Sequence, residues 1–261
     1  MQQPAFAVMP GCEAWSHVAG SPVGALVLHG FTGTPASMRN VAEALAAAGH
    51  DVELPRLPGH GTSVDDLLST TWHDWTAEVE AAYQRLASRV ERVVVVGLSM
   101  GGALTLRMAF DHPSIAAIAC VNPATKARPA EMLVAIDELI AEGTSLVPGE
   151  GRSDIADPDG FDTAYDDTPL VPLRSLLLDG IAPMSDRYGE LMMPLRLFTS
   201  RNDHVVDPGD SVHLADSYGG PVEHTWLERS FHVATRDYER DLIIAELTTF
   251  VADLAPSSSA P

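Results

Sequence analysis

The sequence predicts an α/β fold with a mostly parallel, doubly wound sheet and a small helical cap inserted after the sixth strand. Short apolar runs rich in β-branched residues alternate with segments of helical spacing, which is typical of parallel strands joined by crossover helices. This alternation stops at Asn122-Pro123 and resumes near residue 194. The four valines from Val93 to Val96 lead directly into a Gly-Leu-Ser-Met-Gly turn and then a helical segment.

The first 124 residues contain most of the expected sheet. Residues 1–21 are weakly patterned and leave room for one or two edge strands. Continuous apolar runs then indicate strands buried on both faces, because such strands lose the alternation of polar and apolar residues. We expect strands at 23–28, 52–54, 93–96 and 115–121, and helices at 35–49, 72–89 and 102–110.

The segment 125–187 offers no strand candidate. One amphipathic helix is indicated by the spacing of Met132, Leu133, Ile136, Leu139 and Ile140. At least one more helix is expected within residues 170–184, and an acidic stretch rich in Gly and Pro separates the two. Beyond this segment we expect strands at 194–200 and 221–227, and helices after Pro208 and over 237–254.

This pattern divides the chain into three parts. The core comprises residues 1–124 and 188–254, the cap residues 125–187, and the tail residues 255–261, which we expect to be disordered. The cap is inserted at the carboxyl ends of the strands, where ligands bind in folds of this class. We therefore expect the functional site between cap and core.

Composition excludes several classes of function. The chain has 261 residues and a net charge of −20, which argues against nucleic acid and anionic membrane surfaces as partners. It contains no apolar run long enough for stable membrane insertion, and its N-terminus does not resemble a signal peptide. The two cysteines are too few for a disulfide framework. We expect a cytoplasmic protein that acts on a small neutral or cationic molecule.

The residues Gly97-Leu98-Ser99-Met100-Gly101 fit a nucleophile elbow. In this motif a buried strand turns sharply into a helix, and small residues two positions before and after the serine allow the turn. The helix N-terminus directs free N–H groups at negative charge that develops beside the serine oxygen. Ser99 is therefore the expected nucleophile. The alternative is a Gly-Ser turn without chemistry.

A serine nucleophile needs a base and an acid that orients the base. In the elbow architecture these follow in the order Ser, Asp, His, at the ends of later strands. Asp203 and His232 fit this order. Asp207 and Asp210 are competing acids, but they lie further into the loop or the next helix. His204 is a poor candidate for the base, because adjacent residues of an extended segment point apart.

The oxyanion formed at the attacked carbonyl requires two backbone N–H groups. One is expected from Met100, the residue after the nucleophile, and the other from Phe31, in the loop after the strand at 23–28. Gly30 and Gly33 allow that loop to aim its amides. His29 is expected to support this loop. His60 is expected to brace the loop at residues 56–61, and no spacing of His, Cys or carboxylates suggests a metal site.

Five motifs in this order resemble the α/β-hydrolase family, and more narrowly the small bacterial carboxylesterases and monoacylglycerol lipases. The motifs are His29-Gly30-Phe31-Thr32-Gly33, Leu57-Pro58-Gly59-His60-Gly61, Gly97-Leu98-Ser99-Met100-Gly101-Gly102, Asp203-His204-Val205-Val206 and Phe231-His232. The resemblance covers residues 23–121 and 194–252. It implies an α/β-hydrolase fold, a Ser-His-Asp triad of Ser99, His232 and Asp203, a cap over an acyl pocket, and no cofactor.

The expected reaction is cleavage of carboxylic esters through an acyl-enzyme on Ser99. The substrates would be short- or medium-chain acyl esters or monoacylglycerols, since acyl pockets are mostly apolar. Most apolar cap residues pack the cap onto the core, and a minority would line the pocket. The expected substrate-binding residues are Phe31, Met132, Ile136, Leu177 and Ile181.

Other activities use the same triad and remain as alternatives: thioesterase, carbon–carbon hydrolase, cofactor-free haloperoxidase and acyltransferase. Haloalkane dehalogenases and epoxide hydrolases of this fold use an Asp nucleophile, so Ser99 counts against them. The alternative that is not an enzyme is a receptor that retains the fold for ligand binding.

Overall fold

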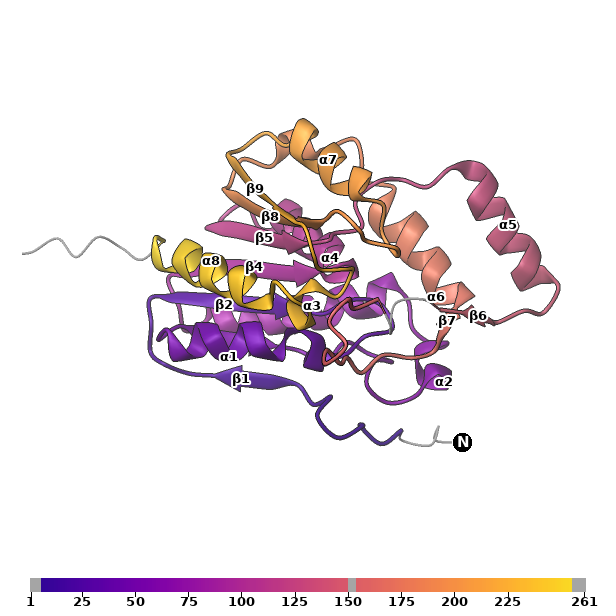
Figure 1. Cartoon of the computed structure of the whole chain (residues 1–261), viewed down its shortest axis with the longest axis horizontal. Coiled ribbons are helices and arrows are strands. Elements are labelled where there is room, and N and C mark those ends of the chain that lie inside the picture. The colour runs from indigo at the N-terminus through magenta and orange to yellow at the C-terminus, as the bar shows by residue number, and fades with distance from the viewer. Residues whose placement is uncertain (1–5, 150–153, 255–261) are drawn as a thin grey trace, which may run out of the picture.

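The computed structural model describes residues 6–149 and 154–254, and within them the main feature is a seven-stranded sheet (Figure 1). Its strands are β1 (Trp15–His17), β2 (Val23–Leu28), β3 (Asp51–Leu54), β4 (Arg92–Leu98), β5 (Ala117–Val121), β8 (Leu195–Ser200) and β9 (Val222–Leu227). The order is β1-β3-β2-β4-β5-β8-β9, and only the β1–β3 pair is antiparallel. This confirms the expected α/β fold with a mostly parallel sheet.

Helices cover both faces of the sheet. Alternate residues of β2 show the two layers: Leu26 and Leu28 pack in one hydrophobic cluster, and Ala25 and Val27 pack in the other. The first cluster includes residues of α3 (Trp72–Ala87), α4 (Met100–Asp111) and α7 (Pro208–Ser217), and the second includes α1 (Arg39–Ala47) and α8 (Arg240–Ala252). Burial on both sides explains why β2 and β4 are almost entirely apolar.

The segment between β5 and β8 forms a separate lobe beyond the carboxyl ends of the strands (Figure 1). It contains α5 (Ala130–Ala141), β6 (Leu146–Pro148), β7 (Asp167–Pro169), α6 (Leu170–Ser175) and the six-residue π-helix η3 (Leu176–Ile181). The expectation of no strand here was wrong, because β6 and β7 pair antiparallel. Each has only three residues, which is too short to establish a periodicity.

The insertion follows the fifth strand and not the sixth. Among the described residues, the N-terminal segment contributes the single edge strand β1, within the expected one or two. Within residues 6–149 and 154–254, the other short helical elements are η1 (Pro35–Met38), α2 (Val64–Leu67), η4 (Tyr188–Glu190) and η5 (Ala234–Arg236). The expected tail, residues 255–261, lies outside the described residues.

Two helix boundaries differ from expectation for local reasons. The helix expected at 35–49 begins with the 3₁₀ turn η1, where Thr34 Oγ accepts a bond from the Ala36 N–H (3.2 Å). The last helix begins at Arg240 and not at Asp237. The Asp237 carboxylate accepts bonds from the N–H groups of Ala156, Asp157 and Phe231, and so binds two loops together.

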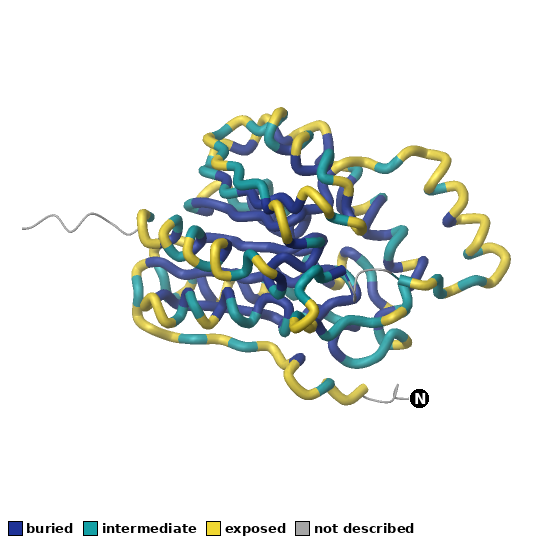
Figure 2. Tube along the Cα trace, in the orientation of Figure 1, coloured by how far each residue is buried: buried dark blue, intermediate teal, exposed yellow. Residues whose placement is uncertain are grey.

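Burial is greatest along the central strands and least on α5 (Figure 2). In α5 the sole buried residue is Ile136. Across the described ranges, no helix has both the length and the apolar character needed to cross a bilayer.

Candidate active site

Ser99 occupies a strained turn between β4 and α4. Its backbone has φ 57° and ψ −118°, a combination that costs an L-residue about 1–3 kcal/mol. The turn is closed by glycines: a Cβ on Gly97 would lie 2.0 Å from the Gly101 carbonyl oxygen, and one on Gly101 would lie 2.3 Å from the Leu28 oxygen. The Ser99 N–H donates to the Val121 carbonyl (3.0 Å), which ties the turn to β5.

Asp203 and His232 follow β8 and β9, and the structure brings their side chains together. His232 Nδ1 lies 2.7 Å from Asp203 Oδ2, and the two side chains are 6% and 2% exposed. The other Asp203 oxygen accepts from the N–H groups of Val205 (2.9 Å) and Val206 (2.8 Å). A carboxylate in this position assigns the ring proton to Nδ1 and leaves Nε2 able to take a proton from a hydroxyl.

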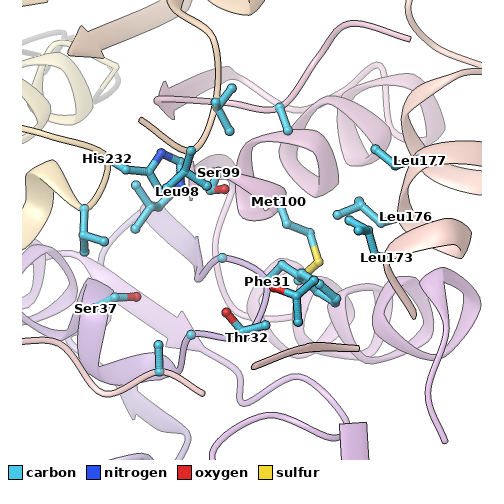
Figure 3. Close-up of a pocket in the computed structure, with 18 of the residues that line it drawn as sticks. Phe31, Thr32, Ser37, Leu98, Ser99, Met100, Leu173, Leu176, Leu177 and His232 are labelled. Atoms are coloured by element: carbon cyan, nitrogen blue, oxygen red, sulfur yellow. The ribbon is translucent and has the colours of Figure 1, made fainter. Parts of the chain in front are cut away.

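Ser99 and His232 line the same cavity, which has a volume of about 270 Å³. The close-up shows the two side chains together at one end of this cavity (Figure 3). Both residues are buried, at 9% and 5% exposure. The three side-chain types that serine acyl transfer uses are thus found at one site, since Ser99 and His232 line the cavity and Asp203 pairs with His232.

The loop after β2 lies against the nucleophile. A Cβ added to Gly30 would be 3.2 Å from Ser99 Cβ and 3.7 Å from its Oγ. The next residue, Phe31, lines the cavity, as does Met100. Met100 is the first residue of α4, so its N–H has no acceptor within the helix. These are the positions expected for the two oxyanion amides.

His29 fixes the shape of that loop. Its Nδ1 lies 3.0 Å from the Gly30 carbonyl oxygen, which can only accept, so Nδ1 carries the proton. Its Nε2 then accepts from the Leu57 N–H (3.2 Å). Burial lowers the pKa of His29 to about 4, so the ring is neutral at physiological pH. This is the supporting function expected from the sequence.

His60 packs behind the same loop. Its Nδ1 bonds to the Pro58 carbonyl (3.0 Å), and its ring contacts those of His29, Phe31 and Trp75. Burial, together with the neighbouring His29, lowers its pKa well below the usual value. A neutral aromatic cluster thus supports the loop that carries Phe31.

The cavity has a polar end and an apolar end. His232 and Ser37 lie on one side of Met100, and Leu173, Leu176 and Leu177 lie on the other (Figure 3). Phe31, Met132, Leu177 and Ile181 line the cavity, and substrate binding by them stays a prediction.

Ile136 was also expected in the pocket but lies outside it, buried in the hydrophobic core beneath α5. Helical spacing identifies the inward face of α5, but it cannot show which inward residues meet the cavity and which meet the core.

Asp162 lines the cavity and was missed by sequence reasoning. Its side chain is buried, and its Oδ1 has no hydrogen-bond partner. Burial raises its pKa to about 6, against the opposing effects of the Thr163 backbone amide, Arg236 and His232. The acidic stretch around Asp162 resembles a solvated loop, so nothing in its local pattern indicated a buried carboxyl.

The competing candidates have other partners. Asp207 caps α7 by accepting from the Gly209 N–H (2.7 Å), and Asp210 pairs with Arg128 (2.9 Å). The His204 ring pairs with Asp154 (2.6 Å). In the part of the chain that the structure describes, no group of three His, Cys, Asp or Glu side chains could hold a metal ion.

The chain is similar to known proteins over most of its length. A family model described as serine aminopeptidase, S33, matches residues 22–239. The chain is 39% identical to a thermostable monoacylglycerol lipase of Bacillus sp. (strain H-257), covering 95% of this chain and 97% of the relative. It is 26% identical to a carboxylesterase of Bacillus subtilis (strain 168), covering 88% and 92%.

The fold is also similar to that of a solved structure. A structure of the metagenome-derived lipolytic enzymes LipS and LipT superposes with a TM-score of 0.87 at 37% identity, covering 95% of this chain and 100% of that chain.

Proposed function

We propose that this chain, which belongs to the serine aminopeptidase S33 family of α/β-hydrolases and cleaves carboxylic esters, acts on monoacylglycerols through an acyl-enzyme on Ser99. The relatives named as a monoacylglycerol lipase and a carboxylesterase support this substrate class. The observation that carries the finer proposal is the buried, unpartnered carboxyl oxygen of Asp162 in an otherwise largely apolar cavity.

The triad accounts for the chemistry in two half-reactions. His232 Nε2 takes the Ser99 hydroxyl proton while Oγ attacks the ester carbonyl, and the amides of Phe31 and Met100 stabilise the oxyanion. The C–O bond to the alcohol breaks, and the alcohol leaves with the proton from His232. Water then gives a proton to His232 and attacks the acyl-enzyme. The acyl C–Oγ bond breaks, His232 returns the proton to Ser99 Oγ, and the carboxylic acid is released. Asp203 orients the imidazole and stabilises its protonated form throughout.

The two ends of the cavity fit the two parts of a monoacylglycerol. The leucines of α6 and η3 would surround the acyl chain. Asp162 lines the same cavity as His232, the residue that would protonate the leaving alcohol, so we assign it to the glycerol part of the substrate. With a pKa of about 6 it is largely ionised at neutral pH, and its free oxygen can accept a bond from a glycerol hydroxyl. A simple alkyl ester offers no such donor.

The test compares esters that share an acyl chain and differ in the alcohol. Wild-type enzyme should have a higher kcat/KM for 1-lauroylglycerol than for ethyl laurate. In Asp162→Leu, kcat/KM for 1-lauroylglycerol should fall roughly 10- to 100-fold, because a hydrogen bond to a charged group is worth about 1.5–3 kcal/mol. Ethyl laurate should be little affected.

Asp159→Leu is the matched control, because Asp159 is exposed on the same loop and does not line the cavity. A fluorophosphonate should label wild-type enzyme and not Ser99→Ala. Equal losses on both esters in Asp162→Leu would contradict the glycerol contact. Absence of ester hydrolysis, or labelling that survives in Ser99→Ala, would contradict the proposed mechanism.

A further inference from the structure

Asp154 is a buried carboxylate that the cap segment contributes to both loops of the triad. Its Oδ2 accepts from the N–H of His232 (2.9 Å) and from the N–H of His204 (3.2 Å). Its Oδ1 pairs with the His204 ring (2.6 Å), and its backbone carbonyl accepts from the Val233 N–H (3.2 Å). The side chain is 8% exposed, so water competes little for these bonds.

The opposite side of His232 is held by Asn122. The Asn122 Nδ2 donates to the His232 carbonyl (2.8 Å), and its Oδ1 accepts from the Ser200 N–H (2.7 Å). Asn122 is 2% exposed and directly follows β5. The carbonyl of His232 is therefore anchored to the residue after β5, and its N–H is anchored to the cap segment.

The position of Asp154 matters because β8 and β9 no longer pair where the triad residues lie. The register of these strands ends at Ser200 and Leu227, before Asp203 and His232. Just beyond that point the Arg201 N–H still donates to the Leu227 carbonyl (3.0 Å), and nearer the triad residues the side chains of Ser200, Asp203 and Asp154 connect the two loops. One oxygen of Asp154 accepts from His232 itself and from the residue after Asp203, so it fixes the separation of the two loops.

We propose that Asp154 is a positioning residue that holds the His232 loop and the Asp203 loop in the relative geometry needed for proton transfer. This inference rests on the catalytic functions proposed above for Asp203 and His232. Asp154 does not line the cavity, so its effect should appear in the chemical step and not in substrate binding. Small displacements of catalytic groups by remote changes can cost about 100-fold in rate.

The experiment compares two substitutions of Asp154, one that removes the oxygen acceptor and one that keeps it. Asp154→Ala removes the bridging oxygen, and kcat should fall roughly 10- to 100-fold with KM within about twofold of wild type. Asp154→Asn is isosteric and keeps an amide oxygen in the place of Oδ2, so both backbone N–H groups retain their acceptor. Its kcat should stay within about threefold of wild type. The rate of fluorophosphonate labelling of Ser99 should follow kcat in both variants.

Asp157→Ala is the matched control for general loosening of this segment. The Asp157 carboxylate is largely buried, pairs with Arg240 (3.0 Å) and accepts from the Asp159 N–H (3.1 Å). It thus resembles Asp154 in burial and chain position, but its bonds go to α8 and to its own loop. Asp157→Ala should keep kcat near that of wild type. The melting temperature of each variant shows whether a lower kcat comes from a loss of folded protein.

Unchanged kcat in Asp154→Ala would overturn the inference, and so would an equal loss in Asp157→Ala or no rescue by Asp154→Asn. A change in KM alone would also overturn it. If wild-type enzyme hydrolyses no ester and is not labelled at Ser99, the proposed function fails instead.

Discussion

Asp203 Oδ2 and His232 Nδ1 lie 2.7 Å apart, although the two residues follow different strands and are separated by the whole of α7 and β9. The two strands are parallel neighbours, so their carboxyl ends bring both loops to the same edge of the sheet. Both Asp203 oxygens are occupied, one by His232 and the other by two backbone N–H groups. The carboxylate is therefore fixed in position before substrate binds.

Asp203→Asn should keep the fold and lose most of the activity. The amide would present an N–H to Nδ1 of His232 or weaken the hydrogen bond between the two side chains. Either effect favours the tautomer with its proton on Nε2, which cannot accept the serine proton. In a related arrangement this change lowers kcat by about 10⁴, and we expect a loss of that order on ester substrates. Asp207→Asn, on the same loop, is the control and should change kcat little. A loss of less than about tenfold in Asp203→Asn would contradict the assigned role.

The elbow should not tolerate a methyl group at its glycines. In Gly97→Ala or Gly101→Ala the added Cβ would meet backbone oxygens at 2.0 Å and 2.3 Å, and backbone cannot move as a flexible side chain can. We expect a loss of about 3 kcal/mol or more in the free energy of unfolding, measured by urea denaturation. Gly189→Ala is the control, since its Cβ would lie 3.4 Å from the nearest atom, the Ser217 oxygen. Equal stability of all three variants would exclude the steric explanation.

Asp162→Asn should stabilise the protein at neutral and alkaline pH. Because the pKa of Asp162 is raised to about 6, the folded chain binds more protons than the unfolded chain between about pH 4 and 6. Its contribution to stability therefore falls as the pH rises through this window and stays reduced above it. The neutral, isosteric amide removes that cost, so the variant should gain about 1–3 kcal/mol at pH 8 and little below pH 4.

Urea denaturation of both proteins at pH 4 and pH 8 measures this difference. Asp159→Asn, on the exposed part of the same loop, should show no gain that depends on pH. A variant at position 162 that is equally stabilised at both pH values would show that desolvation of the carboxylate is not the cause.

Met132→Trp should shift the preference for acyl chains toward shorter ones. Met132 lines the cavity from α5, and the larger side chain would occupy space that an acyl chain needs. A lost methylene contact is worth about 1–3 kcal/mol, so kcat/KM for a dodecanoyl ester should fall at least about tenfold relative to a butanoyl ester. Val134→Trp is the control on the same helix, because Val134 is exposed and does not line the cavity. Parallel profiles in the two variants would contradict the position assigned to the acyl chain.

Much of the fold could be predicted because the buried parallel strands have a clear pattern. The valines of β4 and the apolar run of β2 are covered on both faces, and such strands are hard to confuse with surface segments. The proximity of Asp203 and His232 follows from the same logic, since both come after strands of one parallel sheet. Local chemistry also predicted the tight turn at Ser99, where Gly97 and Gly101 have no room for a Cβ.

The remaining features depend on contacts between distant parts of the chain. Asp154 bonds to residues 50 and 78 positions away, and its own neighbourhood in the sequence is acidic and polar. Asp162 is buried in the folded chain, where it lines the cavity, and its neighbours in the sequence do not indicate this. Ile136 lies one helical turn from the cavity residue Met132 on α5, yet it meets the core. Single-sequence periodicity reports which face is inward, and tertiary packing decides what that face contacts.

The backbone angles of Ser99 favour glycine over serine at this position. Glycine would adopt φ 57° and ψ −118° with less strain than serine, so the hydroxyl is kept at the expense of a better-fitting backbone. A copy released from the need for catalysis would gain stability by drifting to glycine at position 99. A serine at this bend is what the proposed nucleophile requires, although the backbone alone would favour glycine.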